Sequence, residues 1–211
     1  MTTTFEPRNA QDLVRLIAEY PLAWVVSKND SGSGNDSGFG ATPLLLLGET
    51  DAQGRIVSLL GHFALSNPHV TMLRASPQET ILFTGPHGYI SPEAVSRPGW
   101  APTWNYAIAQ FDVDIEFLPQ ENDTALERLV TKMEADRREP WTISRMGERY
   151  AKMAQRILAF RGHVRTARGR FKLGQDETPQ TLAEILTEVN DAALVRWMKD
   201  FNGVGDGSKE S

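Results

Sequence analysis

Two segments of the chain are unusually rich in aromatic, proline, glycine and amide residues. They read GPHGYISP at 85–92 and APTWNY at 101–106. Flat aromatic side chains beside amide donors suit a planar heteroaromatic ligand, which needs stacking and hydrogen bonds to its edge. The residue types also fit two packed turns with Trp104 and Tyr106 in the core. A planar ligand and a pair of structural turns are therefore both open.

Two further segments offer groups that could hold an anion. GHFALSNP at 61–68 ends at Asn67-Pro68, a cap followed by proline at the first helical position. The free N–H groups of such a helix start favour a phosphate, although Asn67 can equally serve as a simple cap. RFKLGQD at 170–176 places cations and an amide at the end of a predicted strand.

Other common catalytic sites are missing from the sequence. The chain has no cysteine, no HExxH and no GxSxG, so thiolate chemistry, zinc sites of these types and the serine-hydrolase elbow are not expected. Its four histidines are His62, His69, His87 and His163, and a metal site would need carboxylates from elsewhere. We expect no metal. The glycines of the polar stretch 29–38 do not follow GxGxxG or P-loop spacing, and we expect a flexible loop there.

The elements that must position these segments are short strands with helices between them. Apolar runs and turn residues predict strands over 22–27, 39–47, 55–60, 79–84, 103–117, 158–166 and 170–173. Helical spacing predicts helices before Pro21, over 68–74, from Asp123 to before Pro140, around 146–157, and from 179 to about 201. Strands that do not alternate with helices favour an α+β fold on a small antiparallel barrel.

The long strand at 103–117 carries two alternating patterns of opposite phase. Apolar residues of one parity alternate with acids at its end, namely Phe111, Val113, Ile115 and Phe117. We expect these four to face inward. Apolar residues of the other parity precede them, namely Trp104, Tyr106 and Ile108. The change of phase predicts a bulge or sharp bend near Ala109-Gln110.

Length and charge set the broad class of the protein. With 211 residues and 23.5 kDa, we expect one domain over 1–202 and a disordered polar tail over 203–211. No apolar run approaches the length of a membrane span and no signal peptide is evident, so a cytoplasmic location is the default expectation. The net charge is -5, yet nine basic residues and one acid fall between Arg145 and Lys172.

Read together, GHFALSNP, GPHGYISP, APTWNY and FKLGQDE resemble the PaiB family. This family is similar to the FMN-binding split barrels, relatives of the pyridoxamine phosphate oxidases. The four motifs follow in order, and the resemblance runs from about Phe39 to Glu177. The resemblance implies a six-stranded antiparallel split β-barrel with peripheral helices. It also implies a homodimer with one FMN per subunit across the dimer interface.

The resemblance also implies a set of cofactor-binding residues. The phosphate is expected near Ser66 and Asn67, with the ring system bordered by other residues of the motifs. The full set is His62, Ser66, Asn67, Tyr89, Thr103, Trp104, Asn105, Lys172 and Gln175. Many family members carry Arg where this chain has Leu65, so a cation must come from elsewhere, and Lys172 is the candidate. Lys172 and Gln175 could approach from the partner subunit.

Three functions remain open at this stage. The first is a flavoprotein that acts as an oxidoreductase or regulator on an unidentified electron donor or substrate, with no catalytic residue identified. The second is a negative transcriptional regulator that contacts DNA, since Arg145, Arg149, Lys152 and Arg156 would share one face of a helix. A solvated helix face explains these cations as well. The third is a haem-binding split barrel, for which His62, His87 or His163 would be the axial ligand.

Overall fold

Seven antiparallel strands form one continuous sheet. The computed structural model describes residues 4–28 and 39–205, and the strands run in the order β2-β1-β5-β6-β7-β4-β3. Their bounds are β1 Leu22–Lys28, β2 Phe39–Leu45, β3 Leu47–Thr50, β4 Ile56–Ala64, β5 Gln78–Ile90, β6 Thr103–Phe117 and β7 Ile157–Lys172. An α+β fold on an antiparallel barrel is confirmed.

The two edges of the sheet are consecutive in the chain. β2 forms one edge and β3 the other, and Leu46 alone separates them. Leu46 is fully buried, and its N–H donates to the carbonyl of Pro21 at 2.9 Å. This corner therefore brings the edges of the sheet together and closes the barrel.

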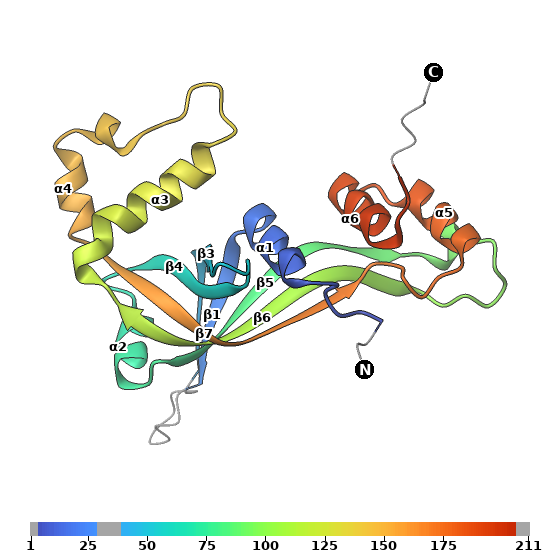
Figure 1. Ribbon diagram of the computed structural model, residues 1–211, viewed down its shortest axis with the longest axis horizontal. Helices are drawn as coiled ribbons and strands as arrows, with labels where there is room; N and C mark the ends of the chain where they lie inside the picture. The colour runs from blue at the N-terminus through green and yellow to red at the C-terminus, as the bar shows by residue number, and fades with distance from the viewer. Residues whose placement is uncertain (1–3, 29–38, 206–211) are drawn as a thin grey trace.

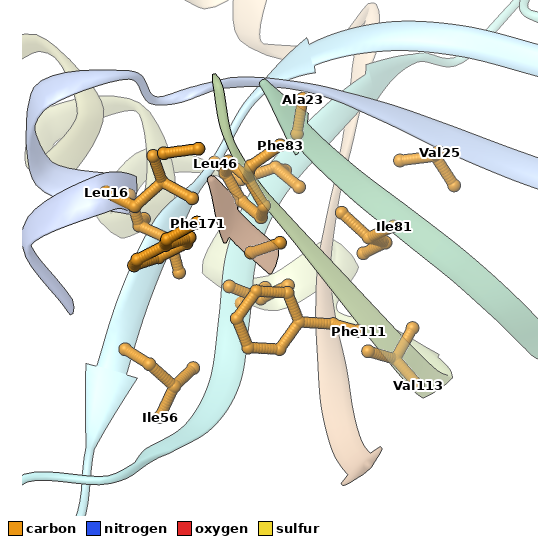
Figure 2. Close-up of a cluster of buried hydrophobic side chains, with 14 of the residues drawn as sticks. Leu16, Ala23, Val25, Leu46, Ile56, Ile81, Phe83, Phe111, Val113 and Phe171 are labelled. Carbon is orange, nitrogen blue, oxygen red and sulfur yellow. The ribbon is translucent and has the colours of Figure 1, made fainter. Parts of the chain in front are cut away.

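The interior of the barrel is filled by alternate residues of the strands. Phe111, Val113 and Ile115 are buried and Phe117 packs against the same core, as predicted. Figure 2 shows Phe111 and Val113 among the inward side chains of β1, β4 and β5. The predicted change of phase within this strand is not present, so that prediction is wrong.

The alternation in β6 continues without interruption to the start of the strand. Asn105, Ala107 and Ala109 point inward, whereas Trp104 and Ile108 lie on the outer face. Apolar residues of the second phase are therefore outward-facing residues of a regular strand. The register shifts lie elsewhere, between Thr84 and His87 in β5 and between Asp112 and Val113 in β6.

Strand boundaries differ from the sequence prediction in two places. The predicted strand 39–47 breaks at Leu46 into β2 and β3. The sheet has seven strands, where the family resemblance implied six. The predicted strands 158–166 and 170–173 are one strand, because Ala167 to Gly169 pair with Phe111 to Ala109 of β6 instead of turning. The expected loop at 29–38 and most of the expected tail lie outside the described residues.

Helices lie around the barrel and at the far end of the sheet (Figure 1). Helix α1 Ala10–Glu19 packs Leu16 and Ile17 into the core, and α2 Pro68–Ala75 packs Val70 and Leu73 into it. An arm between β6 and β7 contains η2 Pro119–Glu121, α3 Asn122–Glu134, η3 Ile143–Met146 and α4 Arg149–Ala154. The C-terminal pair is α5 Pro179–Glu188 and α6 Ala192–Asn202, and η1 Pro92–Ala94 follows β5.

The predicted single helix at 146–157 is not present in the arm. Arg145 lies in η3, α4 ends at Ala154, and Ile157 begins β7. Gly147 separates η3 from α4 with a φ of 55°, a conformation that favours glycine. The basic residues therefore do not form one helical face, although each is exposed.

The barrel continues into an extension that carries the C-terminal helices. β7 pairs with β6 from Phe160 to Lys172, whereas its pairing with β4 ends at His163, so beyond that point β7 pairs with β6 alone. At the far end of this extension Trp197 of α6 is fully buried and stacks with Phe201 at 5.9 Å between ring centroids. Figure 1 shows α5 and α6 at the opposite end of the molecule from α2.

Candidate functional site

The start of α2 has the geometry of an anion site. The side chain of Asn67 accepts a hydrogen bond from the N–H of His69 at 2.9 Å, and Pro68 occupies the first helical position. Ser66 is exposed immediately before the cap. Asn67 Nδ2 also donates to Thr42 Oγ1 at 3.3 Å, which fixes the cap to β2. Free N–H groups and the helix dipole attract negative charge to this point.

His62 lies on β4, five residues before the cap. Its neighbour Phe63 contacts the ring of His69, so strand alternation places His62 on the other face of β4. Burial lowers the pKa of His62, and its Nδ1 is buried with no hydrogen-bond partner among the described residues. The ring is therefore neutral and retains one unsatisfied nitrogen.

An aromatic surface lies at the extension, where β5 and β6 pair. Tyr89 and Trp104 are register partners, each is 53% exposed, and their ring centroids are 6.1 Å apart. His87 is also stacked with Trp104, with a centroid distance of 6.4 Å and an interplanar angle of 26°. Three accessible rings on one face of a hairpin form a platform for a planar ligand.

One cation lies at the start of β6, beside this platform. Lys172 of β7 donates from Nζ to Thr103 Oγ1, and both side chains are half-buried. Thr103 directly precedes Trp104. The predicted neighbours Thr103, Trp104, Tyr89 and Lys172 are therefore brought together by the pairing of β5, β6 and β7.

Two residues predicted to bind the cofactor have hydrogen-bond partners within the fold instead. Asn105 is 2% exposed and lies under α6, where its Nδ2 is 3.6 Å from Met198 Sδ. Gln175 caps the end of β7, since Nε2 donates to the Phe171 carbonyl and Oε1 accepts from the Leu173 N–H, each at 2.6 Å. Both amide side chains therefore stabilise the fold around the candidate site, and neither points to an open surface.

The helix start at Asn67, called the phosphate end because a phosphate is expected there, and the aromatic platform, called the aromatic end, are far apart in a single chain. His62 pairs with Ala159 of β7, and Lys172 is 13 residues further along the same strand. At about 3.3 Å per residue, this separation is about 40 Å along the strand. Figure 1 shows the two ends on opposite sides of the barrel. One mononucleotide cannot bridge them within one subunit.

The outer face of the sheet between these ends carries several exposed apolar side chains. Trp24, Leu82 and Ile108 are between 37% and 48% exposed, and Trp24 pairs directly with Leu82 in the register of β1 and β5. A groove of about 340 Å³ runs beside Leu82 and Ile108, with Arg168 and Arg170 on its other side. A row of large apolar side chains on a sheet face marks a surface for association.

Sequence reasoning missed a buried polar cluster next to α2. Ser27, His69 and Glu79 come from β1, α2 and β5, and each is at most 5% exposed. Nothing in the local sequence marked Ser27 or Glu79, because strand pairing alone brings them together. His69 was noted only as one of four histidines.

Two absences apply to the described part of the chain. It contains no group of three or more His, Cys, Asp or Glu side chains placed to hold a metal ion. No helix in residues 4–28 and 39–205 is long and apolar enough to cross a membrane.

The closed antiparallel barrel with peripheral helices is the fold of the split-barrel class. Within this class, the chain belongs to the family described as "Putative FMN-binding domain", whose family model matches residues 1–166. The resemblance seen in the sequence is confirmed, and FMN is the cofactor that this membership supports.

One relative is similar to this chain over part of its length. "Protease synthase and sporulation protein PAI 2" of Bacillus subtilis is 26% identical over 137 residues, which are 63% of this chain and 65% of that protein. This chain thus spans somewhat less than two thirds of the relative's length.

The solved structures with a similar fold include two of low sequence identity. A "putative 5-nitroimidazole antibiotic resistance protein" from Bacteroides thetaiotaomicron is 14% identical with a TM-score of 0.55, covering 78% of this chain and 84% of that one. The "FAD and Heme binding protein" from Mycobacterium smegmatis is 16% identical with a TM-score of 0.56, covering 79% and 73%.

Proposed function

We propose that the protein is an FMN-binding split barrel in which two copies of the chain build each flavin site. The observation that carries this proposal is the separation of the phosphate end from the aromatic end in one subunit. A second copy, packed on the apolar outer face of the sheet, supplies the missing half. A two-fold axis then creates two equivalent sites per dimer.

The chain's own residues would bind and orient the cofactor. Ser66 and the N–H groups after Asn67 hold the phosphate of FMN, while Tyr89 and Trp104 of the other copy provide contact area for the ring system. Lys172, also of the other copy, supplies the positive charge for the phosphate that the uncharged Leu65 cannot provide. Thr103 holds the ammonium group of Lys172 in place. FMN, when bound, supplies the redox chemistry of an oxidoreductase or a redox-sensing regulator.

Mixing two defective variants tests the shared site. Ser66→Asp repels the phosphate, and Trp104→Ala with Lys172→Ala removes the aromatic end; each variant alone should bind FMN weakly in a fluorescence titration. After the two are unfolded together and refolded, half the dimers are mixed and each mixed dimer has one intact site. About a quarter of the sites should then recover wild-type affinity. No recovery would place the whole site within one chain and contradict the proposal.

Contact with DNA is a second candidate, favoured by the exposed cations of the arm. Arg149, Lys152 and Arg156 have no ion-pair partner among the described residues, and Arg145 precedes them in η3. If the arm binds DNA, affinity should fall steeply with salt and be lost in Arg149→Ala with Arg156→Ala. Absence of retardation at low salt would dismiss this role.

The haem alternative has less support from the positions of the histidines. His163 forms a pair with Glu116 at 2.7 Å on the surface, and His87 stacks against Trp104. His62 is half-buried and neutral. An absorption spectrum of the purified protein distinguishes flavin from a haem Soret band.

A further inference from the structure

A chain of hydrogen bonds connects a buried carboxyl group to the cap of α2. Glu79 is hydrogen-bonded to Ser27, and Ser27 Oγ is hydrogen-bonded to His69 Nε2. On the other side of the ring, His69 Nδ1 lies 2.9 Å from Thr42 Oγ1. Thr42 Oγ1 accepts from Asn67 Nδ2 at 3.3 Å. The chain thus ends at the helix start that we assign to the phosphate.

The inner residues of this series of hydrogen bonds are buried. Ser27 is 2%, His69 3% and Glu79 5% exposed, and Glu79 Oε2 has no hydrogen-bond partner among the described residues. An unsatisfied buried carboxyl oxygen costs stability unless the group has another role. Neither packing nor helix capping needs a carboxyl group at this position.

The donors and acceptors in this series of hydrogen bonds can be arranged in two self-consistent ways, one for each protonation state of Glu79. With Glu79 ionised, Ser27 donates to the carboxylate, His69 donates from Nε2 to Ser27, and Thr42 donates to Nδ1. With one proton added at Glu79, Glu79 donates to Ser27, Ser27 donates to Nε2, and Nδ1–H donates to Thr42. The ring then carries its hydrogen on Nδ1 in place of Nε2, and the Thr42 hydroxyl hydrogen is released from the ring.

We propose that Glu79 is a positioning residue for the phosphate seat at the start of α2, acting through Ser27, His69 and Thr42. When Glu79 is protonated, the Thr42 hydroxyl is free to donate toward a bound anion. When Glu79 is ionised, that hydroxyl donates inward and the carboxylate adds negative charge behind the seat. This inference deepens the proposed function and rests on it.

The groups around Glu79 allow both states near neutral pH. Burial raises the pKa of Glu79 to about 7 despite the hydrogen bond from Ser27, and burial lowers the pKa of His69, which stays neutral. Across β6 the register partner of Glu79 is the apolar Val113.

Charged residues on the neighbouring elements face elsewhere. On α2, the guanidinium group of Arg74 lies over the ring of Phe117 at 5.8 Å. On β6, Asp112 and Asp114 flank Val113 on the opposite face of the strand, where they pair with Arg168 and Arg165. His69 is therefore the titratable group that faces Glu79 from an adjoining element within the described residues.

FMN titrations at several pH values test the inference in the full-length protein. Wild type is compared with Glu79→Gln, a neutral isostere, and with Glu139→Gln, an exposed carboxylate of the arm. The ionisation of the FMN phosphate itself affects all three equally. From about pH 6 to 8.5, the Kd of wild type should rise at least about fivefold relative to that of Glu79→Gln, and Glu139→Gln should follow wild type.

The outcomes separate this inference from the function on which it rests. A constant ratio of Kd values between wild type and Glu79→Gln, with tight binding in both, overturns the role of Glu79 and leaves the flavin site intact. Absence of FMN binding in wild type at every pH overturns the proposed function, and the role of Glu79 with it.

A second measurement needs no ligand. In protein labelled with ¹⁵N-histidine, the His69 ring should change from the Nε2–H to the Nδ1–H tautomer as the pH falls through about 7. Glu79→Gln and Ser27→Ala should each hold one tautomer over this range. A single tautomer in wild type from about pH 5.5 to 8.5 would contradict the coupling, whatever the FMN result.

Discussion

In the proposed flavin site, the ammonium group of Lys172 would be held in place before FMN binds. Lys172 is the last residue of β7, and its ammonium group donates to Thr103 at the start of β6. Because the neighbouring Trp104 is exposed, the cation lies at the border of the aromatic platform. A charged group held in this way loses little conformational entropy when it binds an anion.

We expect Lys172→Ala to weaken FMN binding by about ten- to a hundredfold, since a charge-assisted contact contributes about 1.5–3 kcal/mol. Quenching of flavin fluorescence measures the change. Lys132→Ala, on the exposed surface of α3, is the matched control and should bind as wild type does. Equal affinity in Lys172→Ala would exclude this side chain from the site.

Glu49 is a second residue whose charge matters, here for stability. It pairs with Arg161 at 2.7 Å and with Arg128 at 2.5 Å, and it accepts from Ser58 at 2.6 Å. Burial opposes its ionisation, but these hydrogen bonds prevail and lower its pKa to about 2. Glu49 thereby joins β3, β4 and β7 to the arm.

The pH dependence of stability should reveal this network. A carboxyl whose folded pKa is lowered stabilises the protein above its unfolded pKa, and this contribution disappears as the pH falls from about 4.5 to 2. Glu49→Gln should be less stable than wild type by about 1–2 kcal/mol at pH 7, after allowance for solvent screening. Urea denaturation should show the gap narrowing toward pH 3; a gap independent of pH would contradict this account.

At the scale of elements, the barrel depends on close contact at its closing corner. A Cβ atom at Gly61 of β4 would lie 2.3 Å from Leu46 Cδ2 and 3.2 Å from the Leu45 carbonyl oxygen. The backbone of β4 must therefore approach the corner between β2 and β3 without a side chain between them.

Gly61→Ala should destabilise the protein by about 1–3 kcal/mol, because overpacking forces the corner residues to move. Thermal and urea unfolding measure the loss. Gly205→Ala, where no atom lies within 4 Å of the added Cβ, is the control and should change stability by less than about 0.5 kcal/mol. Equal stability of the two variants would show that the corner tolerates a side chain.

At the scale of the whole molecule, the outer sheet face connects oligomeric state to cofactor binding. The exposed apolar residues of β1, β5 and β6 lie between the two halves of the proposed flavin site. A dimer formed on this face would bury them and complete both sites together.

We expect light scattering to give about twice 23.5 kDa for wild type at micromolar concentration. Leu82→Glu with Ile108→Glu should give a monomer with an unchanged circular dichroism spectrum, because both side chains lie outside the core. The same variant should lose FMN affinity. A monomer that retains full affinity would separate dimer formation from the flavin site.

The sequence by itself determined the properties that depend on neighbours along the chain. The cap at Asn67, the inward set Phe111, Val113 and Ile115, the α+β class and the FMN-binding family all followed from local patterns and motifs. Local hydrogen bonds and the two-residue period of a strand act over a few residues, so they can be read without the fold.

Only the tertiary structure decided which side chains lie on each face of the sheet and at each end of the molecule. The continuous phase of β6 placed Trp104 and Ile108 outside, and α6 covered Asn105. The same pairing separated Lys172 from the helix start and brought Glu79 to Ser27 and His69. These contacts join residues distant in sequence, and their geometry follows from register, barrel closure and packing, which no local pattern specifies.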